Sequence, residues 1–116
     1  ELTQDVSTLE HFFEVGEING KITERIQKIA VILGYMGNAA VSTSLLASRW
    51  GKLVNNACMS GMSAACGCTF GEVINDEKAR ACLSYLGREV KSCCEAEGYE
   101  LPTLVMGFSY PCFLGN

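Results

Sequence analysis

Apolar residues recur every three or four positions through much of the chain, a spacing that predicts a protein built mainly of α-helices. The longest such run extends from about residue 44 to residue 66. The residues expected to form its buried stripe are Leu46, Trp50, Leu53, Ala57 and Gly61. We therefore predict one long helix here and expect the other elements to pack around it.

A helix is also predicted on each side of this long one. The first spans about residues 21–35 and ends at Gly34 and Gly37, with Asn38 in the turn. Its predicted buried stripe is Ile22, Ile26, Ile29, Ala30 and Leu33. The other spans about residues 76–97, and its predicted buried stripe is Ala79, Cys82, Leu83, Leu86, Val90, Cys93 and Cys94.

Shorter segments connect these helices. Residues 9–15 have strand-like character, and Asn19-Gly20 marks a turn. Residues 39–42 form an extended link, and Ser42, Thr43 or Ser44 can cap the long helix. Residues 71–74 can form a single helical turn. The fold class predicted from the pattern is thus all-α, around a long central helix, with a short extended N-terminal segment.

A row of polar residues interrupts the apolar character of the long helix. Lys52, Asn56 and Ser60 are spaced four residues apart, which places their side chains on one face over two turns. The simplest explanation is a solvated face, because lysine commonly extends to water and asparagine commonly caps a neighbour. The alternative is a binding row, since an ammonium and an amide one turn apart can hold an anionic or carbonyl group.

Composition and charge exclude several functions. The chain has 116 residues, a net charge of −4 and no cluster of basic residues, so we expect no nucleic-acid binding. No stretch reaches the ~18 apolar residues of a membrane helix, so no membrane partner is expected. Residues 101–116 carry no charged side chain, so this tail must pack on another surface. We therefore expect the chain to be a fragment.

The seven cysteines do not form a recognisable framework. Their odd number argues against a disulfide scaffold, and Cys66-Gly-Cys68 and Cys93-Cys94 lack the spacing of zinc knuckles. Most fit helix faces where a reduced cysteine acts as a small hydrophobe. We expect no metal site and a reducing, cytoplasmic location, while a cysteine-based redox or metal module stays a minor alternative.

Several motifs, in order, resemble the C-terminal domain of the ketopantoate reductases, or 2-dehydropantoate 2-reductases. The central one is W-x-K-L-x-x-N-A, which runs from Trp50 to Ala57. The others are Gly16-Glu-Ile-Asn-Gly20, Thr23-x-Arg25, Thr69-Phe-Gly-Glu72, Arg88-Glu-Val and Glu97-Gly98. The resemblance covers about residues 14–102.

This resemblance implies a domain organisation. Residues 1–18 would be the end of a linker and the last strand of a missing nucleotide-binding (Rossmann) domain, here without its sheet. Residues 19–116 would be a truncated helical substrate domain like that of 6-phosphogluconate dehydrogenase-like enzymes. A homodimer is a further expectation. The chain itself carries no G-x-G-x-x-G after a strand.

The resemblance also implies a reaction, the NADPH-dependent reduction of ketopantoate to pantoate in pantothenate and coenzyme A biosynthesis. Lys52 matches the family's proton donor, and Asn56 matches an asparagine that binds substrate. NADPH would be bound mainly by the absent domain, so the fragment alone would be inactive. Glu72 is expected to serve as a helix-end residue rather than as a catalytic acid.

One position departs from the family pattern. Ser60 stands where the family usually has a second asparagine, and a hydroxyl is shorter with fewer donors. A reductase for a different 2-keto acid is therefore one alternative. A non-catalytic helical dimerisation or binding module is another.

Overall fold

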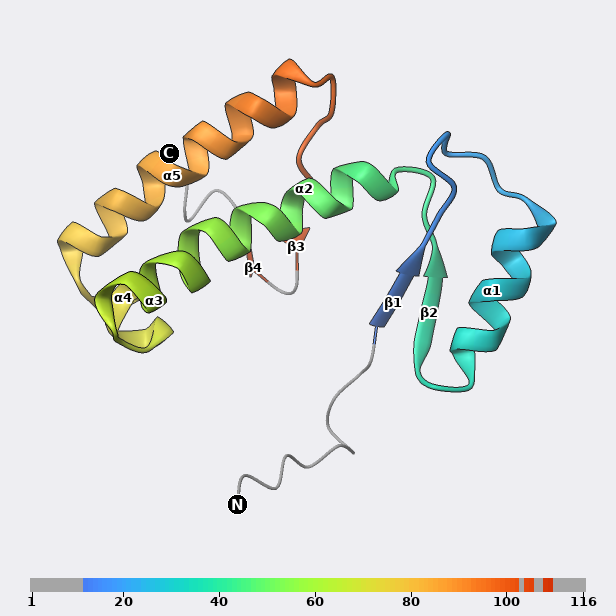
Figure 1. The fold of residues 1–116 in the computed structure, drawn as a ribbon, viewed down its shortest axis with the longest axis horizontal. Coiled ribbons are helices and arrows are strands. Elements are labelled where there is room, and N and C mark those ends of the chain that lie inside the picture. The colour runs from blue at the N-terminus through green and yellow to red at the C-terminus, as the bar shows by residue number, and fades with distance from the viewer. Residues whose placement is uncertain (1–11, 103, 106–107, 110–116) are drawn as a thin grey trace. The chain divides into compact units, whose positions relative to one another are not determined.

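The computed structural model describes residues 12–102, 104–105 and 108–109 (Figure 1). The chain divides into two compact units between Leu45 and Leu46. The first contains a strand, a helix and a second strand: β1 (Phe12–Val15), α1 (Glu24–Gly34) and β2 (Asn38–Val41). The second contains α2 (Leu45–Asn55), η2 (Asn56–Ser60), α3 (Gly61–Cys66), α4 (Phe70–Asn75), α5 (Glu77–Ala96), β3 (Leu104–Val105) and β4 (Phe108–Ser109).

The N-terminal unit is a β-α-β arrangement. β1 and β2 pair in parallel, from Phe12 opposite Asn38 to Val15 opposite Val41. A helix between two parallel strands is the usual crossover, because parallel strands cannot be joined by a tight turn. The chain passes close to itself beside this sheet, since a Cβ on Gly16 would lie 2.5 Å from the carbonyl oxygen of Ser42. Glycine is therefore required at that position.

Several details of this unit differ from the sequence prediction. The N-terminal strand was expected without a sheet, but β2 supplies a partner for it. α1 begins three residues late because the Thr23 hydroxyl accepts a hydrogen bond from the Ile26 amide at 3.2 Å and caps the helix. Asn38 opens β2 rather than lying in a turn.

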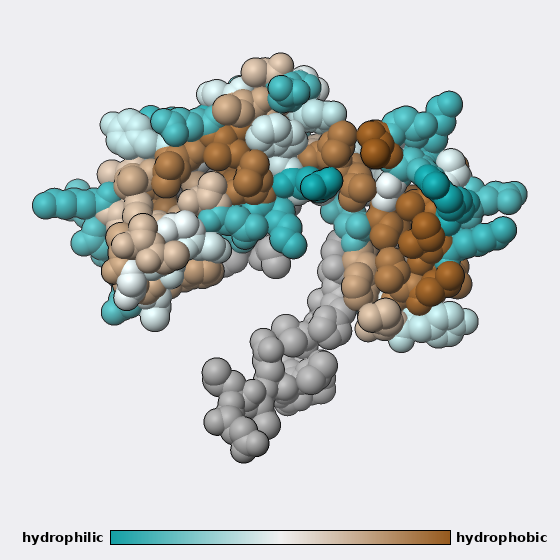
Figure 2. Space-filling model, viewed as in Figure 1, coloured by the Kyte–Doolittle hydropathy of each residue, from teal (hydrophilic) through white to brown (hydrophobic). Residues whose placement is uncertain are grey.

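The buried stripe of α1 is narrower than predicted. Ile26 is buried, and Ala30 and Leu33 are half-buried. Ile22 precedes the helix and is 58% exposed, and Ile29 is 38% exposed. Apolar side chains consequently gather on the surface of α1, as Figure 2 shows. The large apolar residues exposed on α1 and just after it are Ile29, Val31, Ile32, Tyr35 and Met36.

The predicted long helix is present in the C-terminal unit. α2, η2 and α3 follow one another without a break, because Asn55, Ser60 and Gly61 all have right-handed helical backbone angles. The predicted boundaries, 44–66, agree with the observed span from Leu45 to Cys66. The unpredicted feature is η2, a π-helical turn in the middle.

The buried face of this helix is not the one predicted. Leu53 is 48% exposed and Gly61 is exposed, whereas Ala47, Gly51, Val54 and Cys58 are buried. The spacing of this second set is equally helical, so periodicity alone could not choose between two adjacent stripes. The small side chains of the buried set allow closer packing than Trp50 and Leu53 would.

α4 and α5 complete the C-terminal unit, and both begin at side-chain caps. Thr69 accepts from the Glu72 amide at 3.3 Å, and Asp76 accepts from the Ala79 amide at 2.8 Å. α5 agrees with the predicted helix over 76–97, with Asp76 and Glu97 as its caps. Its buried face is Leu83, Gly87 and Cys94, while Cys82 and Cys93, which were predicted to be buried, are exposed.

The core of this unit joins four elements. The residues of the buried cluster are Val54, Cys58, Met59, Val73 and Leu83. They come from α2, η2, α4 and α5, so the long helix is packed against both later helices. The predicted fold class, mostly α around a long helix, is confirmed, with the parallel β1–β2 pair as an addition.

No helix in the described ranges combines the length and the apolar character needed to cross a membrane. Leu101, the first residue of the apolar tail that was predicted to pack on another surface, packs against the core cluster. The side chains of the tail from residue 103 onward lie outside the described residues.

Candidate functional site

The three predicted site residues lie on consecutive turns of the long helix. Lys52 is in the last turn of α2, and Asn56 and Ser60 are the first and last residues of η2. All three are exposed. The structure therefore brings them together as one polar row on the solvent-facing side of the C-terminal unit.

The π-helical turn changes the geometry of this row. In an α-helix with 3.6 residues per turn, a residue four positions on lies about 40° round the axis, so a row at i, i+4 and i+8 drifts by about 80°. In η2 the Gly61 amide donates to the Asn56 carbonyl, five residues back, which widens the turn. The angle between Asn56 and Ser60 about the helix axis therefore differs from that in a regular helix.

The opposite side of the same turn is fixed in the core. Cys58 and Met59 are buried, and the Cys58 thiol donates to the Leu83 carbonyl at 3.6 Å. Burial raises the pKa of the Cys58 thiol, so this group stays neutral and does not serve as a nucleophile. The π turn is thus held on α5 while its polar side faces outward.

The exposed surface that follows the row along the helix is made of small residues. Gly61, Ala64 and Ala65 are all exposed. A flat surface of this kind leaves room beside Asn56 and Ser60 for a ligand or a neighbouring chain.

Glu72 has a structural role, as predicted. Its carboxylate accepts hydrogen bonds from the Thr69 amide at 2.7 Å and from the Thr69 hydroxyl at 2.8 Å, forming a capping box at the start of α4. These bonds, the amide's first, lower the pKa of Glu72. A carboxylate held ionised in this way is a poor general acid.

The strand-to-helix turn between β1 and α1 does not fit a dinucleotide. The pyrophosphate of NADPH needs free amides and no negative charge at such a helix start. Here the Glu17 carboxylate accepts from the Thr23 hydroxyl at 2.6 Å and pairs with Arg25. The hydrogen bond from Arg25 first, and that from Thr23 second, lower the pKa of Glu17. The ionised Glu17 carboxylate therefore occupies the start of α1, where a pyrophosphate would have to bind.

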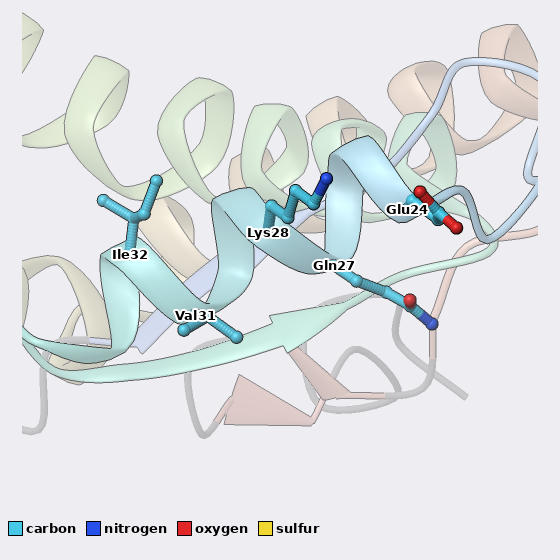
Figure 3. A pocket seen from close by; sticks show the side chains of 5 residues that line it. All are labelled: Glu24, Gln27, Lys28, Val31 and Ile32. Atoms are coloured by element: carbon cyan, nitrogen blue, oxygen red, sulfur yellow. The ribbon is translucent and has the colours of Figure 1, made fainter.

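An open depression on α1 is a poor candidate for a substrate site. Its volume is about 660 Å³, and its lining residues are Glu24, Gln27, Lys28, Val31 and Ile32 (Figure 3). All five belong to one helix, so the depression is a space between neighbouring side chains and contains none of the predicted site residues.

The sequence analysis named Cys66-Gly-Cys68 but missed Met62 as a neighbour of this pair at the end of α3. The Cys66 thiol lies 3.6 Å from the thioether of Met62. Burial first, and the neighbouring Cys66 second, raise the pKa of the Cys68 thiol. The signal that could have revealed it is the i, i+4 spacing of Met62 and Cys66 followed by a glycine.

Comparison with known proteins gives one family. The model of the ketopantoate reductase PanE/ApbA C-terminal domain matches residues 44–106, which include the polar row and the core of the C-terminal unit. No curated protein and no solved structure matches the chain.

Proposed function

The chain belongs to the ketopantoate reductase PanE/ApbA C-terminal family, and we propose that it supplies the substrate-binding, proton-donating part of an NADPH-dependent 2-keto acid reductase. The observation that carries the proposal is the exposed row of Lys52, Asn56 and Ser60 within the matched region. The proposed substrate is ketopantoate.

In this proposal Lys52 acts on the keto oxygen. As a hydride reaches the carbonyl carbon, negative charge develops on the oxygen, and the Lys52 ammonium both stabilises that charge and donates its proton to give the hydroxyl. Water then returns a proton to the amine. A lysine in this role must be able to reach substrate, and its exposure in the structure allows that.

Asn56 and Ser60 orient the substrate. The Asn56 amide offers both donors and an acceptor, and the Ser60 hydroxyl can do either. These two residues are exposed on the turns that follow Lys52, and in this proposal one small acid contacts all three. The shorter Ser60 leaves more space than an asparagine would, which suits either ketopantoate with a bridging water or a bulkier 2-keto acid.

The exposure of Lys52 also shows what the isolated chain lacks. A proton-donating lysine works best when its ammonium is partly desolvated, which brings its pKa toward neutrality. In the C-terminal unit Lys52 is in contact with solvent. We propose that a nucleotide-binding domain covers this face during the reaction and excludes water from it.

NADPH supplies the hydride in this family. The described residues do not fit the dinucleotide, because Glu17 occupies the helix start after β1. We therefore propose that the cofactor is held by a separate nucleotide-binding domain, with the chain's own contribution restricted to the substrate and the proton.

The test is NADPH oxidation by the protein that carries this chain together with its nucleotide-binding domain, with ketopantoate as substrate. Replacement of the proton donor, Lys52→Ala, should lower kcat by ~10²–10⁴-fold. The matched control is Lys78→Ala, which removes another exposed lysine from the C-terminal unit and should leave kcat unchanged.

The other outcomes separate the parts of the proposal. Turnover that survives in Lys52→Ala would remove the lysine from the mechanism and leave the reaction standing. Absence of turnover on ketopantoate, with NADPH still bound, would indicate a different 2-keto acid, and Ser60→Asn would then be expected to restore activity on ketopantoate. Absence of turnover on any 2-keto acid would contradict the proposed function.

A further inference from the structure

Three sulfur atoms meet at the C-terminal end of α3. Met62 and Cys66 are one helical turn apart, and their sulfur atoms lie 3.6 Å from each other. Cys68 follows two residues after Cys66, and burial first and the neighbouring Cys66 thiol second raise the pKa of the Cys68 thiol. One thioether and two thiols therefore occupy a single small region.

The backbone conformation after α3 holds Cys68 next to the last turn of the helix. Gly67 has a left-handed conformation, with φ of 63°, which turns the chain back over the last helical turn. The Cys68 amide donates to the Ser63 carbonyl at 3.1 Å, and the Ser63 hydroxyl donates to the Cys68 carbonyl. These two bonds hold Cys68 at both its amide and its carbonyl, beside Cys66.

The surroundings of the cluster are apolar on one side and open on the other. Met62 and Cys68 are half-buried and pack against the core cluster, whereas Cys66 is exposed. A ligand can therefore enter past Cys66 and come to rest against sulfur and hydrocarbon.

The chemistry of these donors selects the ligand. Thiolate and thioether sulfur prefer soft ions such as Cu(I), whereas a structural zinc site needs four ligands in a tetrahedral arrangement. The two nearest carboxylates are already engaged, because Glu72 closes the capping box of α4 and Asp76 caps α5. The cluster thus offers three soft ligands, which suits low-coordinate Cu(I).

We propose that Met62, Cys66 and Cys68 form a binding site for a soft monovalent metal ion, with Cu(I) as the ion. The two thiols would bind as thiolates, with release of their protons to solvent, and the Met62 thioether would complete the site. The site is independent of the reductase reaction, and its test needs neither substrate nor NADPH.

The test is a competition for Cu(I) between the reduced full-length chain and the chromophoric chelator bicinchoninate under anaerobic conditions. The double variant Cys66→Ser, Cys68→Ser should bind the ion at least ~10²-fold more weakly, since loss of even a supporting contact costs 10–100-fold in metal sites. The matched control, Cys82→Ser with Cys93→Ser, removes two exposed cysteines of α5 and should retain the tight site.

A second measurement tests whether the Met62 thioether binds the metal, and it does not depend on the cysteine variants. Ag(I), a redox-inert analogue, should shift the methyl resonance of Met62 in NMR spectra of the methyl-labelled chain, and Met62→Leu should weaken Cu(I) binding about tenfold. Circular dichroism confirms that each variant is folded. Equal losses of affinity in the two double variants, or an unmoved Met62 methyl signal at saturation, would overturn the proposal.

Discussion

At the scale of single residues, the spacing of apolar positions does not determine which face of the long helix is buried. That choice depends on how the helix packs in the folded protein. Leu53 and Val54 are neighbours in the chain, yet Leu53 is 48% exposed and Val54 is 1% exposed. Periodicity favoured the face that includes Leu53, but the buried face is the adjacent one, with Ala47, Gly51 and Val54. Hydrophobic spacing alone therefore does not separate the two faces.

This assignment can be tested with a pair of leucines. Leu83→Ala empties a fully buried position in the core cluster and should lower the free energy of unfolding by about 2–5 kcal/mol, the usual cost of such a cavity. Leu53→Ala removes an exposed side chain and should cost about 0.5 kcal/mol or less. Urea denaturation of the full chain measures both, and similar losses in the two variants would contradict the observed core.

At the scale of elements, the helix caps depend on local signals and the π turn does not. Asp76 with its following acid and Thr69 with Glu72 are local signals, and both caps form as such signals predict. A π turn has no comparable signature, because it depends on how the segments before and after it are anchored. Here Val54 and the pair Cys58 and Met59 are all buried in one cluster, which only the structure reveals.

The role of η2 can be tested by deleting Ala57. A π turn contains about one residue more than an α turn, so the deletion should restore a regular helix while Val54, Cys58 and Met59 stay in the core cluster. Ser60 would then lie three positions after Asn56 and turn away from it. We expect a folded protein, seen by circular dichroism, whose kcat/KM in the proposed reaction falls by ~10²-fold, as misplaced substrate groups typically cause. Unchanged kcat/KM would show that the alignment of the row has no catalytic role.

At the scale of the whole molecule, the two units have unequal cores. Within the described residues Ile26 is the sole buried apolar residue of the N-terminal unit, whereas the C-terminal unit buries seven, from Ala47 to Cys94. Burial of apolar surface is the main favourable term in folding. The β1–α1–β2 unit therefore holds little stabilising energy of its own.

Hydrogen exchange directly measures the difference in local stability between the two units. In the full chain, backbone amides of α1 and β2 should exchange ~10²-fold faster than those of η2 and the middle of α5, since protection follows local stability. If a nucleotide-binding domain completes the small parallel sheet, its addition should slow exchange in α1 and β2 and leave α5 unchanged. Equal protection of both units in the isolated chain would contradict the inferred difference.

The sequence revealed the type and order of most elements, and the structure supplied their partners. The helices around Ile26, Val54 and Leu83 were predicted because their apolar spacing is local. The parallel pairing of Val15 with Val41 was missed because it joins residues separated by a whole helix. The predicted domain boundary at residues 18–19 stays a prediction, whereas the compact units meet between Leu45 and Leu46.

The parallel pairing of β1 and β2 has a consequence for how the protein is made. On the ribosome, β1 emerges before β2, so its parallel pairing forms only after α1 and then β2 have been synthesised. Extended apolar segments of this kind are what chaperones of the nascent chain bind. Translation speed across α1 therefore sets how long this segment needs protection, and rare codons there should make the yield of folded protein depend on chaperone supply.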